Sequence, residues 1–250
     1  MITVPRAPAW LVVQDLGWPD QRAVGMPSGG AMDRHALSVA NLLVGNPAGA
    51  AGLEWALGPG TLRFEQPTTF ALAGAAVEAT LDGRPVALHT PHQAGTGEEL
   101  VIGRIRAGVF AYIGVHGGIG VDPVMGSRST YVRGGFGGLH GRRLRAEDFL
   151  PVGEPSSPAA PAGFTVPEEL LGLGGDGPIR VTAGPQASLF STENRELLVD
   201  SDWLIAAASD RMGYRLKGPE IRTTEPTTHA SEPACPGAIQ VPAAGGPIVL

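Results

Sequence analysis

Apolar residues recur at helical spacing after Asp33. Positions 36, 37, 40, 43 and 44 are all apolar, and these intervals of three and four place them on one face of a helix. Asp33 is a favourable N-cap residue, and Gly45 and Pro47 are typical of the residues that end a helix. The pattern therefore predicts one clear helix over residues 33–44.

Most other apolar runs are short and rich in β-branched residues, which is typical of strands. In the first part of the chain they cover residues 69–73, 77–81, 86–88, 100–105 and 109–115. Asp82-Gly83 predicts a tight hairpin, and the glycine-containing stretch at 106–108 predicts a second one. Short strands joined by tight turns predict a mostly β protein, either a barrel or a sandwich.

A proline-rich stretch divides the chain. Residues 151–167 contain five prolines and almost no large apolar residues, which is typical of a linker or a long surface loop. We therefore predict a first β lobe over 1–150 and a second over 168–250. Residues 179–182, 196–199 and 203–207 are the predicted strands of the second lobe.

Composition and charge exclude several classes of protein. The 250 residues are 43% hydrophobic, enough for a core, and the formal net charge of −6 argues against nucleic-acid binding. No apolar stretch approaches the roughly 20 residues of a membrane span, so we expect no membrane contact and a cytoplasmic protein. Cys235 is the single cysteine, so an internal disulfide is excluded.

Lysine usage limits the chemistry further. Lys217 is the only lysine and is followed by glycine, so the sequence holds no Walker A phosphate loop. Its neighbours also differ from the methionines that usually flank a biotin-bearing lysine. Arginine and backbone amides must therefore bind any anion, and biotin would have to come from another domain.

The strongest candidate site precedes the predicted helix. The segment LGWPDQRAVGMPSGGAMD, residues 16–33, contains Ser28, Gly29 and Gly30 just before a helix N-terminus. Backbone N–H groups and the helix dipole at such a position favour a carboxylate, a phosphate or an oxyanion. A plain surface turn before a capped helix is the alternative, and spacing alone does not decide between them.

Two further polar segments could supply donors. GSRSTY, residues 126–131, combines Arg128 with Ser127, Ser129, Thr130 and Tyr131, and SDRMGYR, residues 209–215, contains Arg211 and Tyr214. Both could also be turns whose hydroxyls bond their own backbone. His116-Gly117-Gly118 is interpreted as a β-turn, and the pair His89 and His92 is too sparse to predict a metal site.

Read together, five segments resemble one family. They are QDLGWPDQRAVGMPSGGAMD (14–33), ANLLVGNP (40–47), GSRSTY (126–131), SDRMGYRLKGP (209–219) and PGAIQVP (236–242). The chain resembles the carboxyltransferase C–D family, also called allophanate hydrolase subunit 2, which includes the C subunit of 5-oxoprolinase and KipA. The resemblance implies a two-lobed, cyclophilin-like β-barrel. Family members usually continue beyond position 250, so we expect this chain to lack the family's C-terminal end.

The resemblance also implies a function. It predicts a subunit, inactive alone, of a bacterial ATP-dependent 5-oxoprolinase that converts 5-oxoproline to glutamate. The implied partners are an A–B protein (the KipI-like B subunit) and a lactam-binding third subunit, with ATP as cofactor. The alternatives are a biotin-dependent carboxyltransferase component for urea or allophanate, and a regulatory module that binds a sensor-kinase inhibitor.

The resemblance further implies one cleft lined by the three polar segments. The implied substrate-binding residues are Ser28, Gly29, Gly30, Ser127, Arg128, Ser129, Tyr131 and Tyr214. Asp33, Arg128 and Arg211 are the catalytic candidates. The general base stays open among Asp15, Asp33, Glu54 and Asp210.

Overall fold

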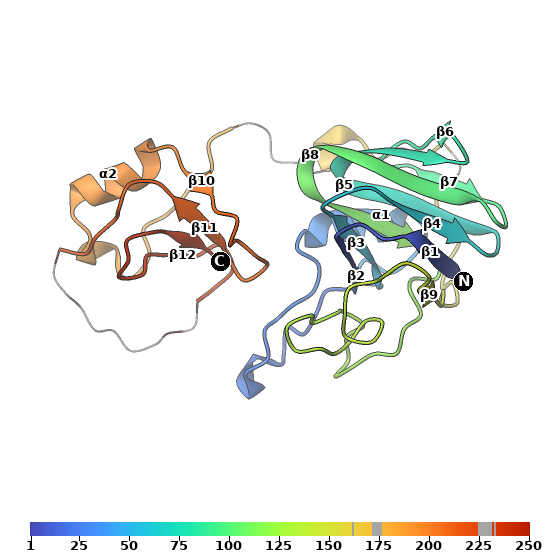
Figure 1. Ribbon diagram of the computed structural model, residues 1–250, viewed down its shortest axis with the longest axis horizontal. Coiled ribbons are helices and arrows are strands. Elements are labelled where there is room, and N and C mark those ends of the chain that lie inside the picture. Colours follow the sequence, from blue (N-terminus) through green and yellow to red (C-terminus); the bar gives the residue numbers. More distant parts are fainter. Residues whose placement is uncertain (162, 172–176, 225–231, 233) are drawn as a thin grey trace. The chain divides into compact units, whose positions relative to one another are not determined.

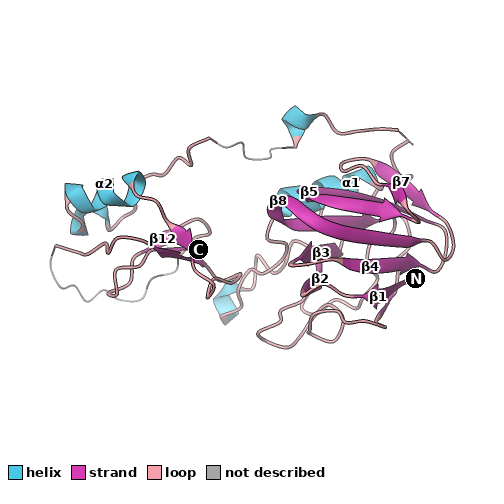
Figure 2. Ribbon diagram, turned by 45° about the horizontal axis from the view of Figure 1, so that its top comes forward, coloured by secondary structure: helices cyan, strands magenta, loops and turns pink. Residues whose placement is uncertain are grey.

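The computed structural model describes every residue except 162, 172–176, 225–231 and 233 (Figure 1). The chain forms two compact units, Met1–Gly175 and Asp176–Leu250, and each is described by itself. In the first unit, the described residues form one nine-stranded sheet, visible in magenta in Figure 2. Its strands are β1 (Ile2–Arg6), β2 (Trp10–Gln14), β3 (Gly52–Ala56), β4 (Gly60–Phe64), β5 (Thr68–Leu81), β6 (Arg84–Pro85), β7 (Pro91–Ala94), β8 (Glu99–Val115) and β9 (Phe149–Leu150).

The long strand β8 organises this sheet. Along one edge, its first residues pair with β4 (Leu62 opposite Leu100) and its last residues pair with β3 (Leu53 opposite Ile113). Along the other edge it pairs with β5 from Phe70 to Leu81. The strand order is β2-β3-β8-β4-β1-β9, with β5 carrying β6 and β7, and the sheet curls as a half-barrel. The predicted mostly β class is confirmed.

Helix α1 (Arg34–Leu43) covers one face of β5 and β8, as both ribbon views show. The side chain of Asp33 accepts a hydrogen bond from the Ala36 N–H at 2.9 Å, so the predicted helix and its N-cap are confirmed. A Cβ on Gly114 of β8 would lie 2.6 Å from the carbonyl carbon of Ala40. Glycine at this position therefore lets the helix approach the sheet closely.

The two faces of β5 belong to two apolar clusters. Phe70 and Leu72 join the larger cluster, which draws side chains from β1, β2, β3, β4 and β8. Ala71 and Ala73 face the smaller cluster beneath α1. Burial on both faces explains the uninterrupted apolar run from Phe70 to Ala73, because alternation appears only where one face meets water.

The turn predictions have mixed outcomes. The hairpin at Asp82-Gly83 is confirmed: both residues have positive φ, and Leu81 pairs with Arg84. The second predicted hairpin is wrong, because β8 runs without a turn through residues 106–108. Gly108 has a φ of +78° beside register shifts between β5 and β8, so this glycine marks a bulge. Residues 86–88 are also not a strand, since β6 ends at Pro85.

The proline-rich segment 151–167 is a loop bonded to the first unit in its described part. The Ala160 N–H donates to the Leu43 carbonyl at 3.1 Å, and the Val166 N–H donates to the His89 carbonyl at 3.2 Å. Ser157 Oγ donates to the Gly45 carbonyl at 2.5 Å. The bonds of Ala160 and Ser157 hold this part of the segment beside the end of α1, and the bond of Val166 holds the later part beside His89. Two short 3₁₀ helices, η1 (Arg22–Val24) and η2 (Glu168–Leu170), complete the helices of this unit in the described residues.

The second unit has shorter elements. In its described residues, strands β10 (Leu204–Ile205), β11 (Tyr214–Lys217), β13 (Ile248–Val249) and β12 (Ile239–Gln240) pair in that order, with η3 (Ala187–Leu189) and α2 (Thr192–Asp200) before them. The strand predicted over 196–199 is wrong, because these residues belong to α2. Ser191 caps that helix by accepting from the Asn194 N–H at 3.3 Å. Residues 179–182 are not a strand either, and only β10 falls within the predicted strand 203–207.

Helices long and apolar enough to cross a membrane are not found among the residues that the structure describes.

Candidate functional site

The candidate site is built on a closed loop, residues 16–30, between β2 and α1. The Trp18 N–H donates to the Ser28 carbonyl at 2.6 Å, and the Ala31 N–H donates to the Asp15 carbonyl at 2.8 Å. Gly17 and Gly30 face each other with φ of +78° and +83°. A Cβ on Gly17 would lie 2.6 Å from the Gly30 nitrogen, so both glycines are needed to close the loop. We call residues 16–33, which comprise this closed loop and the residues that lead into α1, the Gly/Ser loop.

Trp18 anchors this loop. Its side chain is buried, and Nε1 donates to the Val124 carbonyl at 2.8 Å. Its ring meets Phe136 edge-on with centroids 5.5 Å apart, and Phe136 meets Tyr131 in the same way at 5.3 Å. Tyr131 therefore belongs to an aromatic cluster that lies against the base of the loop.

Asp15 joins the Gly/Ser loop to the GSRSTY segment. Its Oδ1 accepts from the Gly17 N–H at 2.7 Å and from the hydroxyls of Ser127 and Ser129 at 2.6 Å each. Its Oδ2 accepts from the Arg128 N–H at 2.6 Å. One carboxylate thus fixes two segments that are more than 100 residues apart in the sequence. Ser127 and Ser129 are buried, and their hydroxyls donate to Asp15.

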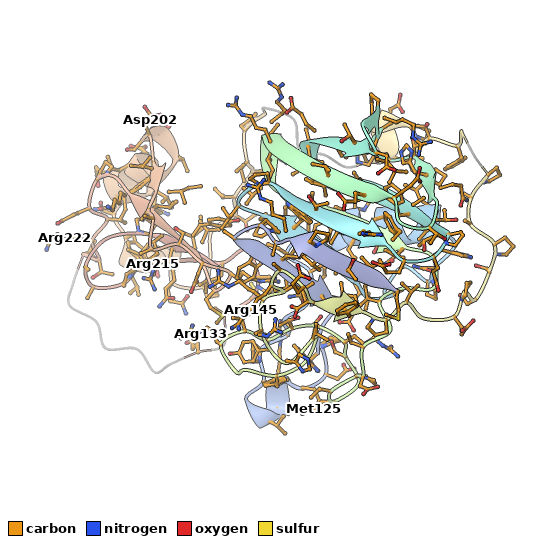
Figure 3. All side chains as sticks on the ribbon, turned by 45° about the vertical axis from the view of Figure 1, so that its right-hand side comes forward. Met125, Arg133, Arg145, Asp202, Arg215 and Arg222 are labelled. Carbon is orange, nitrogen blue, oxygen red and sulfur yellow. The ribbon has the colours of Figure 1, made fainter. Side chains whose placement is uncertain are left out.

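Arg128 lies at the surface beside this junction. Its backbone is held by Asp15, and its Nε donates to the Val121 carbonyl at 2.8 Å, which fixes the start of the guanidinium group. The side chain is otherwise exposed. Met125 and Arg133 are exposed residues of the same loop region and are labelled in Figure 3. The geometry leaves the outer side of the Arg128 fork accessible to a ligand.

A second buried carboxylate fixes the exit of the Gly/Ser loop. Glu54 of β3 is fully buried and accepts from the Trp10 indole N–H at 3.0 Å. It also accepts from the Met32 N–H and the Tyr112 hydroxyl at 2.8 Å each. The Tyr112 hydroxyl in turn accepts from the Asp33 N–H at 2.7 Å. Asp15 and Glu54, two candidates for a general base, are therefore engaged in holding the loop.

Two arginines that the sequence patterns did not single out contact the loop at residues 28 and 29, where it closes on Gly17 and Trp18. Arg22 of η1 donates from Nη2 to the Ser28 hydroxyl at 3.1 Å. Arg34, the first residue of α1, donates from Nη2 to the Gly29 carbonyl at 3.3 Å. Both side chains are exposed. Their positions within or beside the loop segment could have suggested them, because arginine was already the expected anion ligand.

The structure brings most of the predicted residues of the first unit together and describes the others separately. Ser28, Gly29, Gly30 and Asp33 lie on the Gly/Ser loop, and Asp15 links it to residues 126–131. Arg211 and Tyr214 belong to the second unit, where Tyr214 begins β11. Asp210 there accepts from the Met212 N–H at 2.9 Å within a tight turn. The single cleft containing all three segments stays a prediction.

The weaker motifs have structural roles. Residues 115–118 form a β-turn, with the Gly118 N–H donating to the Val115 carbonyl at 2.7 Å, so the turn predicted at His116-Gly117-Gly118 is confirmed. Burial lowers the pKa of His89. Clusters of three or more metal-ligating side chains are not found in the part of the chain that the structure describes. The donors that the site offers to a ligand are therefore the exposed guanidinium groups of Arg22, Arg34 and Arg128 and the Ser28 hydroxyl, which suit an anion or a developing oxyanion.

Comparison with known proteins defines the class. Residues 24–250 match the model of the carboxyltransferase domain, subdomain A and B. The chain belongs to this carboxyltransferase family. The predicted letters C–D are therefore wrong, whereas the carboxyltransferase family itself is confirmed. The spacing of the sequence motifs does not distinguish subdomains A and B from subdomains C and D, so the motifs could not assign the chain to one pair or the other.

Individual relatives show which carboxyltransferase proteins the chain is similar to. The chain is 40% identical over 250 residues to the C subunit of the Escherichia coli 5-oxoprolinase, covering all of this chain and 79% of that protein. It is 32% identical to the C subunit of the Haemophilus influenzae 5-oxoprolinase, with the same coverage. Among solved structures, the Kluyveromyces lactis urea carboxylase superposes on the whole chain with a TM-score of 0.87 and 29% identity. This chain covers 24% of that enzyme.

Proposed function

We propose that this chain is a subunit of a bacterial ATP-dependent 5-oxoprolinase that converts 5-oxoproline to glutamate. The observation that carries the proposal is the 40% identity, over the full chain, to a protein named as the C subunit of a 5-oxoprolinase. Because this chain matches subdomains A and B, we propose that its partner supplies the complementary C and D subdomains of the carboxyltransferase fold. This reverses the assignment of letters expected from the sequence. A lactam-binding third subunit completes the proposed complex.

Within that complex, the Gly/Ser loop and Arg128 are the proposed contact with the substrate. Ser28, Gly29 and Gly30 form the closing end of the loop, and Arg128 offers a rigid fork for a carboxylate or a phosphate. Ser127 and Ser129 support both through Asp15, and Tyr131 packs behind them. Arg211 and Asp33 stay catalytic candidates, and Tyr214 stays a proposed substrate-binding residue.

The donors present fit the phosphate part of ATP better than they fit biotin. Arginine forks and loop amides bind phosphoryl oxygens, and ATP hydrolysis supplies the free energy that drives the opening of an amide ring. The single lysine, Lys217, is exposed at the end of β11 and follows Leu216, so biotin would have to come from another domain or protein. We therefore propose that the residues of this chain orient the substrate anion and stabilise negative charge on the amide oxygen as it develops.

A carboxyltransferase acting in urea metabolism is the second candidate. The superposition on the Kluyveromyces lactis urea carboxylase, with a TM-score of 0.87, supports it. Both reactions activate a small amide-like carbonyl, so one arrangement of donors could serve either. The higher identity to the 5-oxoprolinase protein favours the first candidate.

Reconstitution distinguishes the two candidates. The chain is purified alone and together with the proteins encoded beside its gene, and each preparation is assayed for ATP-dependent release of glutamate from 5-oxoproline. We expect release by the complex and none by the chain alone. In parallel, the same complex is given urea, bicarbonate, ATP and a biotinylated carrier protein. Carboxylation of urea without glutamate release would replace the first candidate with the second.

The role of Arg128 can be measured in the active complex. Replacing it with lysine keeps the charge but removes the planar fork, so kcat/KM should fall roughly tenfold, and Arg128→Ala should lower it further. Arg133→Ala is the matched control, because it removes an exposed arginine from the same loop region. Full activity in both Arg128 variants would mean that the GSRSTY segment is structural.

A further inference from the structure

We infer that Arg22 and Arg34 form a clamp for a small anion at the closing end of the Gly/Ser loop, which deepens the proposed function and rests on it for the identity of the ligand. The two arginines come from different elements, η1 and α1, yet their guanidinium groups bond to consecutive residues. Arg22 reaches the Ser28 hydroxyl at 3.1 Å, and Arg34 reaches the Gly29 carbonyl at 3.3 Å. Both cations therefore occupy one corner of the protein surface.

Neither guanidinium group forms an ion pair with a carboxylate of the described residues. Other exposed arginines are of both kinds: Arg84 pairs with Glu98 and Arg106 with Glu78, whereas exposed arginines such as Arg133 form no ion pair in the described residues. The acids nearest in sequence to the clamp do not pair with it, because Asp33 caps α1 and Asp20 forms no ion pair in the described part. Two like charges held at one corner repel each other, and a bound anion would relieve that repulsion.

The remaining donors point to the chemistry of the ligand. Each guanidinium has five N–H donors and uses one of them on the loop, so most stay available at an exposed position. Gly29 between them is exposed and has a φ of +52°. Planar forks of this kind recognise the paired oxygens of a carboxylate or a phosphate. The ligand class is therefore a small anion with two or three oxygens.

The loop is held firmly enough to present this corner. Trp18 packs beneath Gly29, where an added Cβ would meet its ring at 2.9 Å. Asp15 and Glu54 fix the two ends of the loop from the sheet side. In the proposed reaction, two sources could supply the anion: the carboxylate of 5-oxoproline and a phosphoryl group from ATP.

Titration of the isotope-labelled chain tests the clamp. Inorganic phosphate and 5-oxoproline are added separately, and the amide NMR shifts of Ser28, Gly29 and Arg34 are followed. We expect saturable shifts at these residues with at least one of the two anions, and the anion that binds identifies the source. Arg22→Gln and Arg34→Gln should each weaken that binding about tenfold, whereas Arg106→Gln, which removes an ion-paired arginine, should leave it unchanged.

Two outcomes would overturn the inference: no saturable shift with either anion, or equal weakening by Arg106→Gln, which would show only a response to net charge. Thermal melting of each variant checks that the fold is kept. The proposed function is tested separately by the wild-type complex. An inactive wild-type complex with a working clamp would refute the function alone, and an active complex unaffected by Arg22→Gln would refute the clamp alone.

Discussion

The two units of this chain differ sharply in how many apolar side chains they bury. The first unit contains a continuous core with fully buried Trp55, Phe64 and Phe70. In the described residues of the second unit, only Ala206, Ile221 and Pro247 are apolar residues with buried side chains, and α2 buries none. Burial of apolar surface is the main favourable contribution to folding. The first unit therefore has a core large enough for stable folding, whereas we expect the second unit to be only weakly stable by itself.

The largest expected difference comes from truncating one apolar side chain in each unit. Trp55→Ala should lower the free energy of unfolding of the first unit by about 3–5 kcal/mol, because it leaves a large cavity in the core. Leu204→Ala in β10, where leucine is 68% exposed, should cost less than about 0.5 kcal/mol. Urea unfolding with unit-specific NMR probes measures both. Equal losses would show that the second unit is as well packed as the first.

Removing the shared carboxylate of the first unit should have an intermediate effect. Asp15→Ala leaves four donors without their acceptor, two of them buried serine hydroxyls, and should cost about 2–4 kcal/mol. Amide hydrogen exchange should rise in both the Gly/Ser loop and residues 126–131. Asp210→Ala, the counterpart in an exposed turn of the second unit, should change exchange only locally. Faster exchange in just one of the two first-unit segments would contradict the linkage.

The smallest expected effect concerns acid. Arg142, through its side-chain hydrogen bonds, lowers the pKa of Asp148, and a bond from the Arg145 N–H contributes. A lowered folded-state pKa means that the contribution is complete above the unfolded value of about 3.9 and is lost as the pH falls through the folded value. Asp148→Asn should therefore cost about 1 kcal/mol at neutral pH and progressively less in acid.

The matched control for that prediction lies in the second unit. Glu220 pairs with Arg222, but both side chains are largely exposed, as Figure 3 shows for Arg222. Glu220→Gln should leave the pH dependence of unfolding unchanged, since solvent screens such a pair. Unfolding in urea from about pH 7 to pH 3 measures both variants. A wild-type curve parallel to that of Asp148→Asn would show that the half-buried pair of Arg142 and Asp148 adds no pH-dependent stability.

The sequence predicted the elements that depend on residues close together in the chain. The α1 helix followed from one N-cap and the spacing of its apolar residues, and the turn at Asp82-Gly83 followed from its need for positive φ. The turn predicted at Gly108 was wrong because a bulge and a turn both favour glycine, and only the pairing of β5 distinguishes them. Helix α2 was missed because Leu197, Leu198 and Val199 resemble a strand, although Ser191 gave a capping signal.

The candidate site could be predicted only in part. Its loop was found from composition, and its contact with GSRSTY was implied by family resemblance. Asp15 makes that contact through hydrogen bonds to residues more than 100 positions away, and no spacing rule predicts such bonds. Arg22 and Arg34 lie within or beside the loop segment, but no spacing rule reveals that their guanidinium groups bond to Ser28 and Gly29.

The bonds of Asp15 also limit how this protein can be re-engineered. A loop that is held only by its own ends can be exchanged between relatives as a cassette. Here the Gly/Ser loop and residues 126–131 both donate hydrogen bonds to the Asp15 carboxylate. A loop transplanted alone would therefore lose its link to residues 126–131. A chimera that is to keep a native surface must therefore transfer both segments together with Asp15.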